Sequence, residues 1–235
     1  MSARRTDATP VPAACEARRV ARRWARGFAL LGAMTLLAPA AATAGPAVAR
    51  WASLSLLGGS AQPIATMADY QWDVRPHAAW GAELLAGTGP VAAGLRWWRG
   101  GTTQQVGLAG VSDPAVHTRS VELVTRARVA RWHDVALLAT AAGGRLAISY
   151  HPDRLTVATG GAPVEVALAP LHEWIGGAGL ALQLPLTGGW SMGLETERRL
   201  FALDTAHLSG SSVTLARETF GDWNARLAVA RAWNW

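Results

Sequence analysis

The chain has 235 residues, half of them hydrophobic, and a formal net charge of +6. Most of that charge lies in the first 27 residues, so residues 45–235 hold 15 basic and 14 acidic side chains, a net charge of +1. This balance argues against a nucleic-acid-binding domain, which keeps its basic surplus in the folded part. The single cysteine, Cys15, also lies near the N-terminus. Residues 45–235 therefore have neither a disulfide framework nor a cysteine metal site.

Residues 1–44 predict a secretory signal peptide. Seven arginines precede an apolar run over 28–38, Pro39 ends that run, and Ala42-Thr43-Ala44 forms a cleavage site of small residues. An N-terminal membrane anchor is the alternative, but two prolines and a half rich in alanine and threonine disfavour it. We expect cleavage after Ala44 and a single domain over 45–235.

Beyond residue 49 the chain has no apolar run near 18 residues, so we expect no transmembrane helix. Alternation of apolar and polar residues instead predicts strands throughout. Gly143-Gly144 predicts a bulge, and Arg198-Arg199 predicts a switch of strand face. The segments 155–159 and 164–168 are expected to extend the strands beyond the membrane. We predict eight strands, at 48–57, 74–86, 91–99, 118–132, 135–149, 172–184, 190–203 and 223–235.

The connections between these strands alternate in length. Tight turns are expected near residues 88, 133 and 187, with His133-Asp134 as a two-residue turn. Between them lie longer connections, including a polar loop over 204–221. Short turns that alternate with long loops are typical of outer-membrane barrels, whereas a soluble β-sandwich does not alternate so regularly. The sequence therefore predicts an all-β, eight-stranded antiparallel transmembrane barrel, an up-and-down meander, over 45–235.

The last strand carries the most specific pattern. Apolar residues alternate with small and polar ones, and the sequence ends on an aromatic residue. In this respect the chain resembles small eight-stranded outer-membrane proteins of the OmpA/OmpX type. The resemblance is one of architecture, and it covers the leader and residues 45–235. The resemblance implies that Trp233 and Trp235 are read by the barrel-assembly machinery. Arg231 departs from the pattern, which predicts either a side chain that reaches toward lipid headgroups or a local bulge.

Charged residues collect on the inward face of the predicted strands. An eight-stranded barrel is only wide enough for side chains to fill, so these charges must pair. We predict an arginine–glutamate network that plugs the barrel, and a narrow charged pore is the alternative. The predicted network comprises Glu83, Arg96, Glu122, Arg126, Arg128, Glu195, Glu197 and Arg226, and Arg199 joins it if the strand face switches at Arg198-Arg199.

Tryptophans lie at strand ends and beside turns, where they predict an interface girdle rather than a platform for ligand stacking. The expected girdle comprises Trp80, Trp97, Trp132, Trp174, Trp190, Trp233 and Trp235.

The sequence gives weak signals for chemistry. Six histidines are scattered without metal-ligand spacing, so we expect no metal and no cofactor. The arrangement of His207 and Ser209, with Glu218 nearby, resembles that of the lipid A deacylase barrels, and this resemblance implies an alternative hydrolase function. Turn chemistry explains the serines of this segment, so we expect no catalytic residues here.

The predicted function is therefore a structural or interaction role in a Gram-negative-type outer membrane. Envelope integrity, adhesion or ligand contact through the long loops is expected. A lipid A-modifying hydrolase and a small, porin-like channel are the alternatives. The expected partners are outer-membrane lipid, the assembly machinery and an extracellular ligand, and no nucleic acid.

Overall fold

The computed structural model describes residues 50–107, 110–158, 162–209 and 212–234. The predicted signal peptide, residues 45–49 and Trp235 lie outside the described residues. The described elements are β1 (Arg50–Pro63), η1 (Ala65–Tyr70), β2 (His77–Thr88), β3 (Val91–Thr103), β4 (Ala115–Trp132), β5 (Val135–His151), β6 (Arg154–Val157), β7 (Val164–Ala167), β8 (Leu171–Pro185), η2 (Thr187–Gly189), β9 (Trp190–Ser209) and β10 (Ser212–Asn234).

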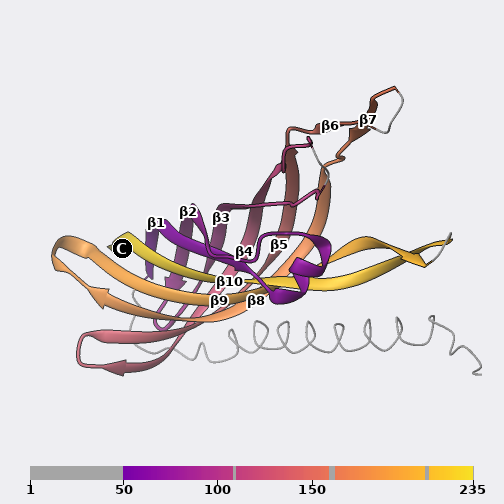
Figure 1. Cartoon of the computed structure of the whole chain (residues 1–235). Helices are drawn as coiled ribbons and strands as arrows, with labels where there is room; N and C mark the ends of the chain where they lie inside the picture. The colour runs from indigo at the N-terminus through magenta and orange to yellow at the C-terminus, as the bar shows by residue number, and fades with distance from the viewer. Residues whose placement is uncertain (1–49, 108–109, 159–161, 210–211, 235) are drawn as a thin grey trace, which may run out of the picture. The chain divides into compact units, whose positions relative to one another are not determined.

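Eight strands close into a barrel (Figure 1). Each pairs antiparallel with its neighbour in the order β1, β2, β3, β4, β5, β8, β9, β10, and β10 pairs back onto β1. The hairpin β6–β7 is a separate two-stranded sheet inserted between β5 and β8. Closure leaves the wall of the barrel without an unpaired edge. The predicted eight-stranded up-and-down barrel is confirmed.

The two faces of the barrel wall are inverted relative to a soluble domain. On β1, Leu54 and Leu56 are exposed on the outside, whereas Ser53 and Ser55 are buried inside. No helix in the described ranges has the length and apolarity needed to cross a membrane. An apolar exterior around a polar interior is the arrangement of outer-membrane barrels, and the protein is a barrel of that membrane.

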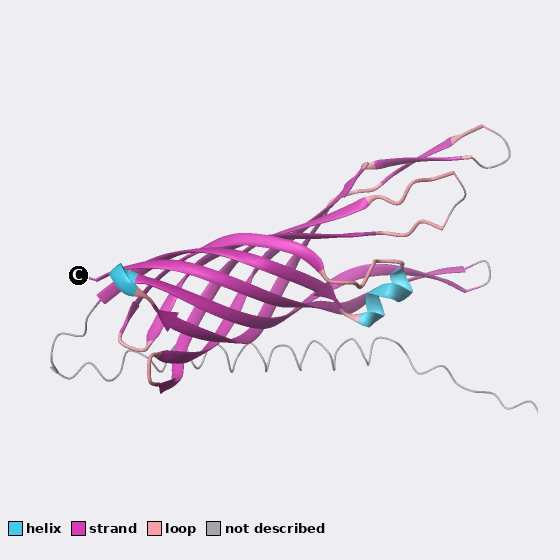
Figure 2. Ribbon diagram, turned by 60° about the vertical axis from the view of Figure 1, so that its left-hand side comes forward, coloured by secondary structure: helices cyan, strands magenta, loops and turns pink. Residues whose placement is uncertain are grey.

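The two ends of the barrel differ (Figure 2). One end, the turn end, carries the short connections at 89–90, 133–134 and 186–189, so the turns predicted near 88, 133 and 187 are confirmed. The other, the loop end, carries the long connections and the projecting hairpins. Short turns face the periplasm in such barrels, so the loop end faces outward from the cell.

The prediction of a polar loop over 204–221 is wrong. Strands β9 and β10 pair continuously from Ser209 opposite Ser212 down to Trp190 opposite Arg231. Polar side chains stabilise this hairpin beyond the membrane: Arg217 on β10 pairs with Asp204 on β9 at 2.8 Å. The polar composition was therefore a property of a water-exposed hairpin rather than of a loop. The segments expected to prolong the strands at 155–159 and 164–168 instead form most of the hairpin β6–β7.

The predicted bulge at Gly143-Gly144 is also wrong. The register between β4 and β5 runs unbroken through Gly144 opposite Glu122, and the irregularity lies at Arg128/Ala130. A Cβ at Gly144 would lie 2.0 Å from the carbonyl oxygen of Val121, so glycine permits the close approach of the two strands here.

Two further expectations about strand faces change. No switch occurs at Arg198-Arg199, because Arg199, Phe201 and Leu203 are all buried on the inward face of β9. The register around Arg231 is unbroken, so there is no bulge there. Arg231 is exposed on the outside, with its guanidinium 5.3 Å from the ring centroid of Trp190.

Candidate functional site

The inward side chains change character along each strand. From the turn end of β9, Ser191 is followed by Glu195, Glu197 and Arg199, and then by Phe201 and Leu203. Strand β10 shows the same order from the turn end. Alanines come first, then Arg226, Asn224 and Asp222, and then Phe220. The interior therefore consists of three layers, which we call the turn-end cavity, the charge layer and the apolar layer.

The charge layer is centred on Arg96, which is fully buried. Strand register places Arg96 on β3 directly between Glu83 on β2 and Glu122 on β4. Its guanidinium also crosses the lumen to β9, with NH2 2.8 Å from Glu195 and NH1 2.5 Å from Glu197. One arginine thus joins carboxylates from both sides of the barrel, which is possible because an eight-stranded barrel is narrow.

Two more arginines complete this part of the layer. Arg126 on β4 bridges Glu83 at 3.0 Å and Glu195 at 2.5 Å. Arg226 on β10 lies 3.1 Å from Glu195 and 3.0 Å from Glu197. Each of these glutamates is therefore held by at least two arginines, which offsets the cost of burying its charge.

Arg199 forms the edge of the charge layer that faces the loop end. Its Nε and NH2 donate to the two carboxylate oxygens of Asp222 at 2.8 and 2.6 Å, a bidentate pair. Its NH1 donates to Glu122 Oε1 at 3.1 Å and to the Ser120 hydroxyl at 3.3 Å. In all, four guanidinium groups face five carboxylates in this layer.

Trp98 anchors the layer from β3. Its Nε1 donates to Asn224 Oδ1 at 3.0 Å, and the guanidinium of Arg226 lies 4.7 Å from its ring centroid. Asn224 in turn donates to Asp222 at 2.7 Å. Space for the ring depends on Gly81 on β2, where a Cβ would lie 2.8 Å from Trp98 Cε3.

The apolar layer fills the loop end above the charges. The 3-10 helix η1 places Met67 inside the barrel, where it is 1% exposed, and Trp72 follows it. Tyr70 packs edge-on against Phe220, with ring centroids 4.9 Å apart. The buried members of this layer are Met67, Trp72, Val116, Leu146, Ile148, Ile175, Phe201, Leu203 and Phe220.

An ion pair ties down the segment that follows η1. Arg75 donates to both carboxylate oxygens of Asp73, with NH2 at 2.6 Å from Oδ2. The backbone N–H of Asp73 donates to the Thr103 carbonyl at 2.8 Å. The hydrogen bonds from Arg75 lower the pKa of the Asp73 carboxyl from its ordinary 3.8 to about 2.

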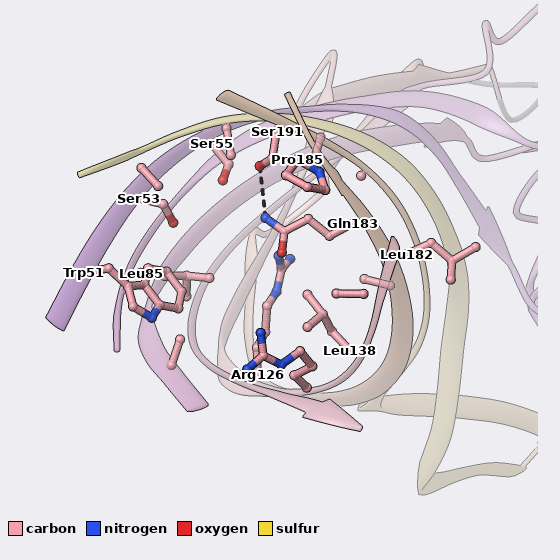
Figure 3. Close-up of a pocket in the computed structure, with 18 of the residues that line it drawn as sticks. Trp51, Ser53, Ser55, Leu85, Arg126, Leu138, Leu182, Gln183, Pro185 and Ser191 are labelled. Carbon is pink, nitrogen blue, oxygen red and sulfur yellow. Dashed lines mark hydrogen bonds between the residues drawn. The ribbon is translucent and has the colours of Figure 1, made fainter. Parts of the chain in front are cut away.

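The turn-end cavity has a volume of about 420 Å³ (Figure 3). Its walls are largely small or apolar, including Leu85 and Leu138, and Arg126 points into it from the charge layer. On the opposite wall Gln183 Nε2 donates to the Ser191 hydroxyl at 2.9 Å. The cavity ends at the charge layer, where Glu195 and Arg126 both line it.

The structure brings together seven of the eight residues of the predicted network, and Arg199 with them. Arg128 does not join, since it is exposed near the bulge at the turn end and lines the cavity. Sequence reasoning missed Asp222, because this residue fell between the loop predicted over 204–221 and the strand predicted from 223. It also missed Trp98, although Trp98 shares the strand face of Arg96.

The hydrolase alternative receives no support from the backbone. His207 and Ser209 lie in β9 rather than in a loop, and their side chains are outside the described residues. Glu218 pairs with Leu203, four positions from His207 along the strand, which is about 13 Å at roughly 3.3 Å per residue. The Glu218 carboxylate accepts a hydrogen bond from Thr205 at 2.9 Å.

Outward tryptophans gather at two heights. Trp80, Trp174 and Trp223 are exposed on the loop side, and Trp190 and Trp233 on the turn side. Strand β10 runs ten residues from Trp223 to Trp233, about 33 Å at roughly 3.3 Å per residue. A strand tilt of about 40–45° reduces this to about 24 Å, close to the apolar band of an outer-membrane barrel, about 25 Å tall.

Comparison with known proteins gives likeness of fold alone. No family model matches the chain, and no curated protein matches it. Among solved structures, a major outer membrane protein from Thermus thermophilus is 12% identical, with a TM-score of 0.44 over 78% of this chain and 99% of that one. Neisserial surface protein A is 8% identical, with a TM-score of 0.41 over 77% and 96% of the two chains. The outer membrane protein AlkL is 10% identical, with a TM-score of 0.43 over 84% and 95%.

Proposed function

We propose that this protein is a closed, non-conducting barrel that acts through its extracellular hairpins. The observation that carries the proposal is the filled interior: the charge layer and the apolar layer each fill the lumen, one after the other along the barrel axis. Arg96, Glu83, Glu122 and Glu197 are each at most 1% exposed. A path for ions would have to break several buried ion pairs, each costly to separate.

Support for a contact role comes from the loop end. Hairpins β6–β7 and β9–β10 extend beyond the barrel (Figure 2). Val164 and Val166 are exposed on the first hairpin, and Leu215, 78% exposed, on the second. Because these apolar side chains lie outside the membrane band, lipid does not cover them, and they suit adhesive contact with an apolar surface.

The first test is conductance. The refolded full chain in planar bilayers is expected to show no discrete conductance steps. Regular single-channel steps would overturn the closed-barrel proposal and favour the channel alternative.

The second test addresses the hairpins. Replacing residues 154–167 with a short glycine–serine linker removes β6–β7 and leaves the eight barrel strands intact. Cells that display this variant are expected to adhere to hexadecane droplets severalfold less than cells with the intact chain, at equal surface amount. The matched control is Leu182→Ala, since Leu182 is exposed on the barrel wall rather than on a hairpin. Unchanged adhesion on removal of β6–β7 would contradict the contact role.

A further inference from the structure

Three arginines gather on the outside of the barrel near the loop end. Arg99 on β3 and Arg119 on β4 are direct cross-strand partners. Arg145 on β5 pairs with Val121, which places it diagonally across from Arg119. Side chains directly opposite each other have Cβ atoms about 4.5–5.5 Å apart, and diagonal ones are within reach of long side chains. We call Arg99, Arg119 and Arg145 the arginine patch.

The arginine patch has no carboxylate partner among the described residues. None of its members takes part in an ion pair there, and the outward positions of β2, β3, β4, β5 and β8 hold no aspartate or glutamate. Arg217 on the β9–β10 hairpin differs, because it pairs with both Glu173 and Asp204. Like charges directly opposite in a sheet are destabilising, so the arrangement calls for an anion from outside the chain.

Tryptophan rings support the patch. The guanidinium of Arg99 lies 5.9 Å from the ring centroid of Trp80, and that of Arg145 lies 4.8 Å from Trp174. Trp80 itself packs edge-on against Trp97, with centroids 4.8 Å apart. A guanidinium stacked on a ring keeps its N–H edges free to donate in its own plane, which is the geometry that recognises phosphate oxygens.

The height of the patch identifies the source of the anion. Trp80 and Trp174 belong to the loop-side tryptophans, which lie at the level where aromatic residues meet headgroups. The loop end faces outward from the cell. The patch therefore lies at the headgroups of the outer leaflet and not in bulk water.

We propose that the arginine patch binds the phosphate groups of outer-leaflet lipid headgroups, with one phosphate bridging Arg99 and Arg119. A phosphate between the two guanidinium groups replaces their repulsion with two charge-assisted contacts. This inference goes beyond the role of the hairpins and does not depend on it, since it concerns the barrel wall alone.

The turn side offers a matched control. Arg231 lies 5.3 Å from the ring centroid of Trp190, so it shares the stacked environment of Arg145. Its register partners are Leu54 and Trp190, and no arginine lies opposite it. Arg231 therefore resembles Arg145 in its contact with a tryptophan ring, but it has no arginine opposite it.

The decisive experiment compares one variant in two lipids. The full chain, Arg119→Gln and Arg231→Gln are reconstituted in phosphatidylcholine nanodiscs with and without phosphatidylglycerol, and the unfolding midpoint is read from the heat-induced gel shift. Arg119→Gln is expected to raise the midpoint in phosphatidylcholine, because repulsion with Arg99 is relieved. It is expected to lower the midpoint with phosphatidylglycerol, because the phosphate loses a contact. A shift of the same sign in both lipids, or none, would overturn the proposal, as would an equal reversal in Arg231→Gln.

Native mass spectrometry gives a second readout. The intact protein is expected to retain phosphatidylglycerol severalfold more than phosphatidylcholine, and the double variant Arg99→Gln, Arg119→Gln is expected to lose most of that preference. Excess inorganic phosphate, at ionic strength matched with sodium chloride, should displace no more lipid than the chloride does. Displacement by inorganic phosphate would show a site for the free ion and would contradict a lipid site.

Discussion

Arg198 and Arg199 are consecutive residues of β9, yet they have opposite surroundings. Arg199 points inward, is 1% exposed, and binds Asp222 and Glu122. Arg198 points outward and is exposed, with its guanidinium 5.5 Å from the ring centroid of Trp223 and no carboxylate partner among the described residues. Since strand alternation separates them by the full thickness of the wall, the same side chain is neutralised by carboxylates inside and supported by an aromatic ring outside.

The contrast extends around the barrel. Strand β3 carries Arg96 inside and Arg99 outside, and β4 carries Arg126 inside and Arg119 outside. Every inward arginine of the charge layer has at least two carboxylate contacts. None of the three outward arginines in the patch has one in the described part of the chain. Inside, the chain supplies its own counter-charges, whereas outside it leaves them to the membrane.

The largest effect is expected from replacing the inward member of the consecutive pair. Arg199→Leu leaves Asp222 and Glu122 buried without this arginine, and breaking a buried ion pair from one side costs about 3–5 kcal/mol. Arg198→Leu loses only a stacked contact at the surface, worth about 0.5–1 kcal/mol. Urea-induced unfolding of both variants in phosphatidylcholine vesicles measures the difference.

A double variant separates charge from packing in that comparison. If the loss in Arg199→Leu comes from an uncompensated carboxylate, adding Asp222→Asn should recover part of it. No recovery would mean that side-chain volume, rather than charge, accounts for the loss. Equal losses in Arg198→Leu and Arg199→Leu would refute the assignment of the two faces.

The strand pattern predicted most of the charge layer because alternation fixes which side of the wall a residue occupies. Glu83, Arg96 and Glu122 follow from period two alone. What the pattern could not supply was the identity of partners across the lumen, because Arg96 meets Glu197 through the barrel's closure and shear rather than through any local spacing.

The errors have a common physical origin. Phe201 and Leu203 are apolar yet face inward, since the loop end of the lumen is filled by an apolar layer together with Met67 of η1. Alternation alone assigns an apolar residue to the lipid face, so Phe201 and Leu203 on the inward face imitate a switch at Arg198-Arg199 that does not exist. Alternation reports the side of the wall reliably only where the interior is polar.

An intermediate loss of stability is expected from replacing Trp98, whose ring lies against the guanidinium of Arg226 and whose indole N–H binds Asn224. Trp98→Phe keeps a ring near Arg226 but removes the donor that Asn224 Oδ1 accepts at 3.0 Å. Leaving that buried acceptor unpaired costs about 1–3 kcal/mol. The urea midpoint measures this loss, with Trp80→Phe as the matched control, because Trp80 is exposed on the outer wall. A smaller loss in Trp98→Phe than in Trp80→Phe would contradict the anchoring role of the hydrogen bond.

The smallest effect is expected at Arg75, an exposed arginine that pairs with the carboxylate of Asp73 outside the membrane. The pKa of Asp73 is lowered from 3.8 to about 2, first by the side-chain hydrogen bond from Arg75. Because the folded pKa is depressed, the stabilisation of the segment around Asp73 is fully present above pH 3.8 and is lost as the pH falls toward 2. Arg75→Gln should raise the pKa of Asp73 toward 3.8, measured by titrating its carboxyl ¹³C shift in nanodiscs. Thr103→Val, which leaves the Asp73–Arg75 pair and the backbone carbonyl of residue 103 in place, should leave that pKa unchanged. If Arg75→Gln also leaves it unchanged, Arg75 is not what holds the carboxyl ionised.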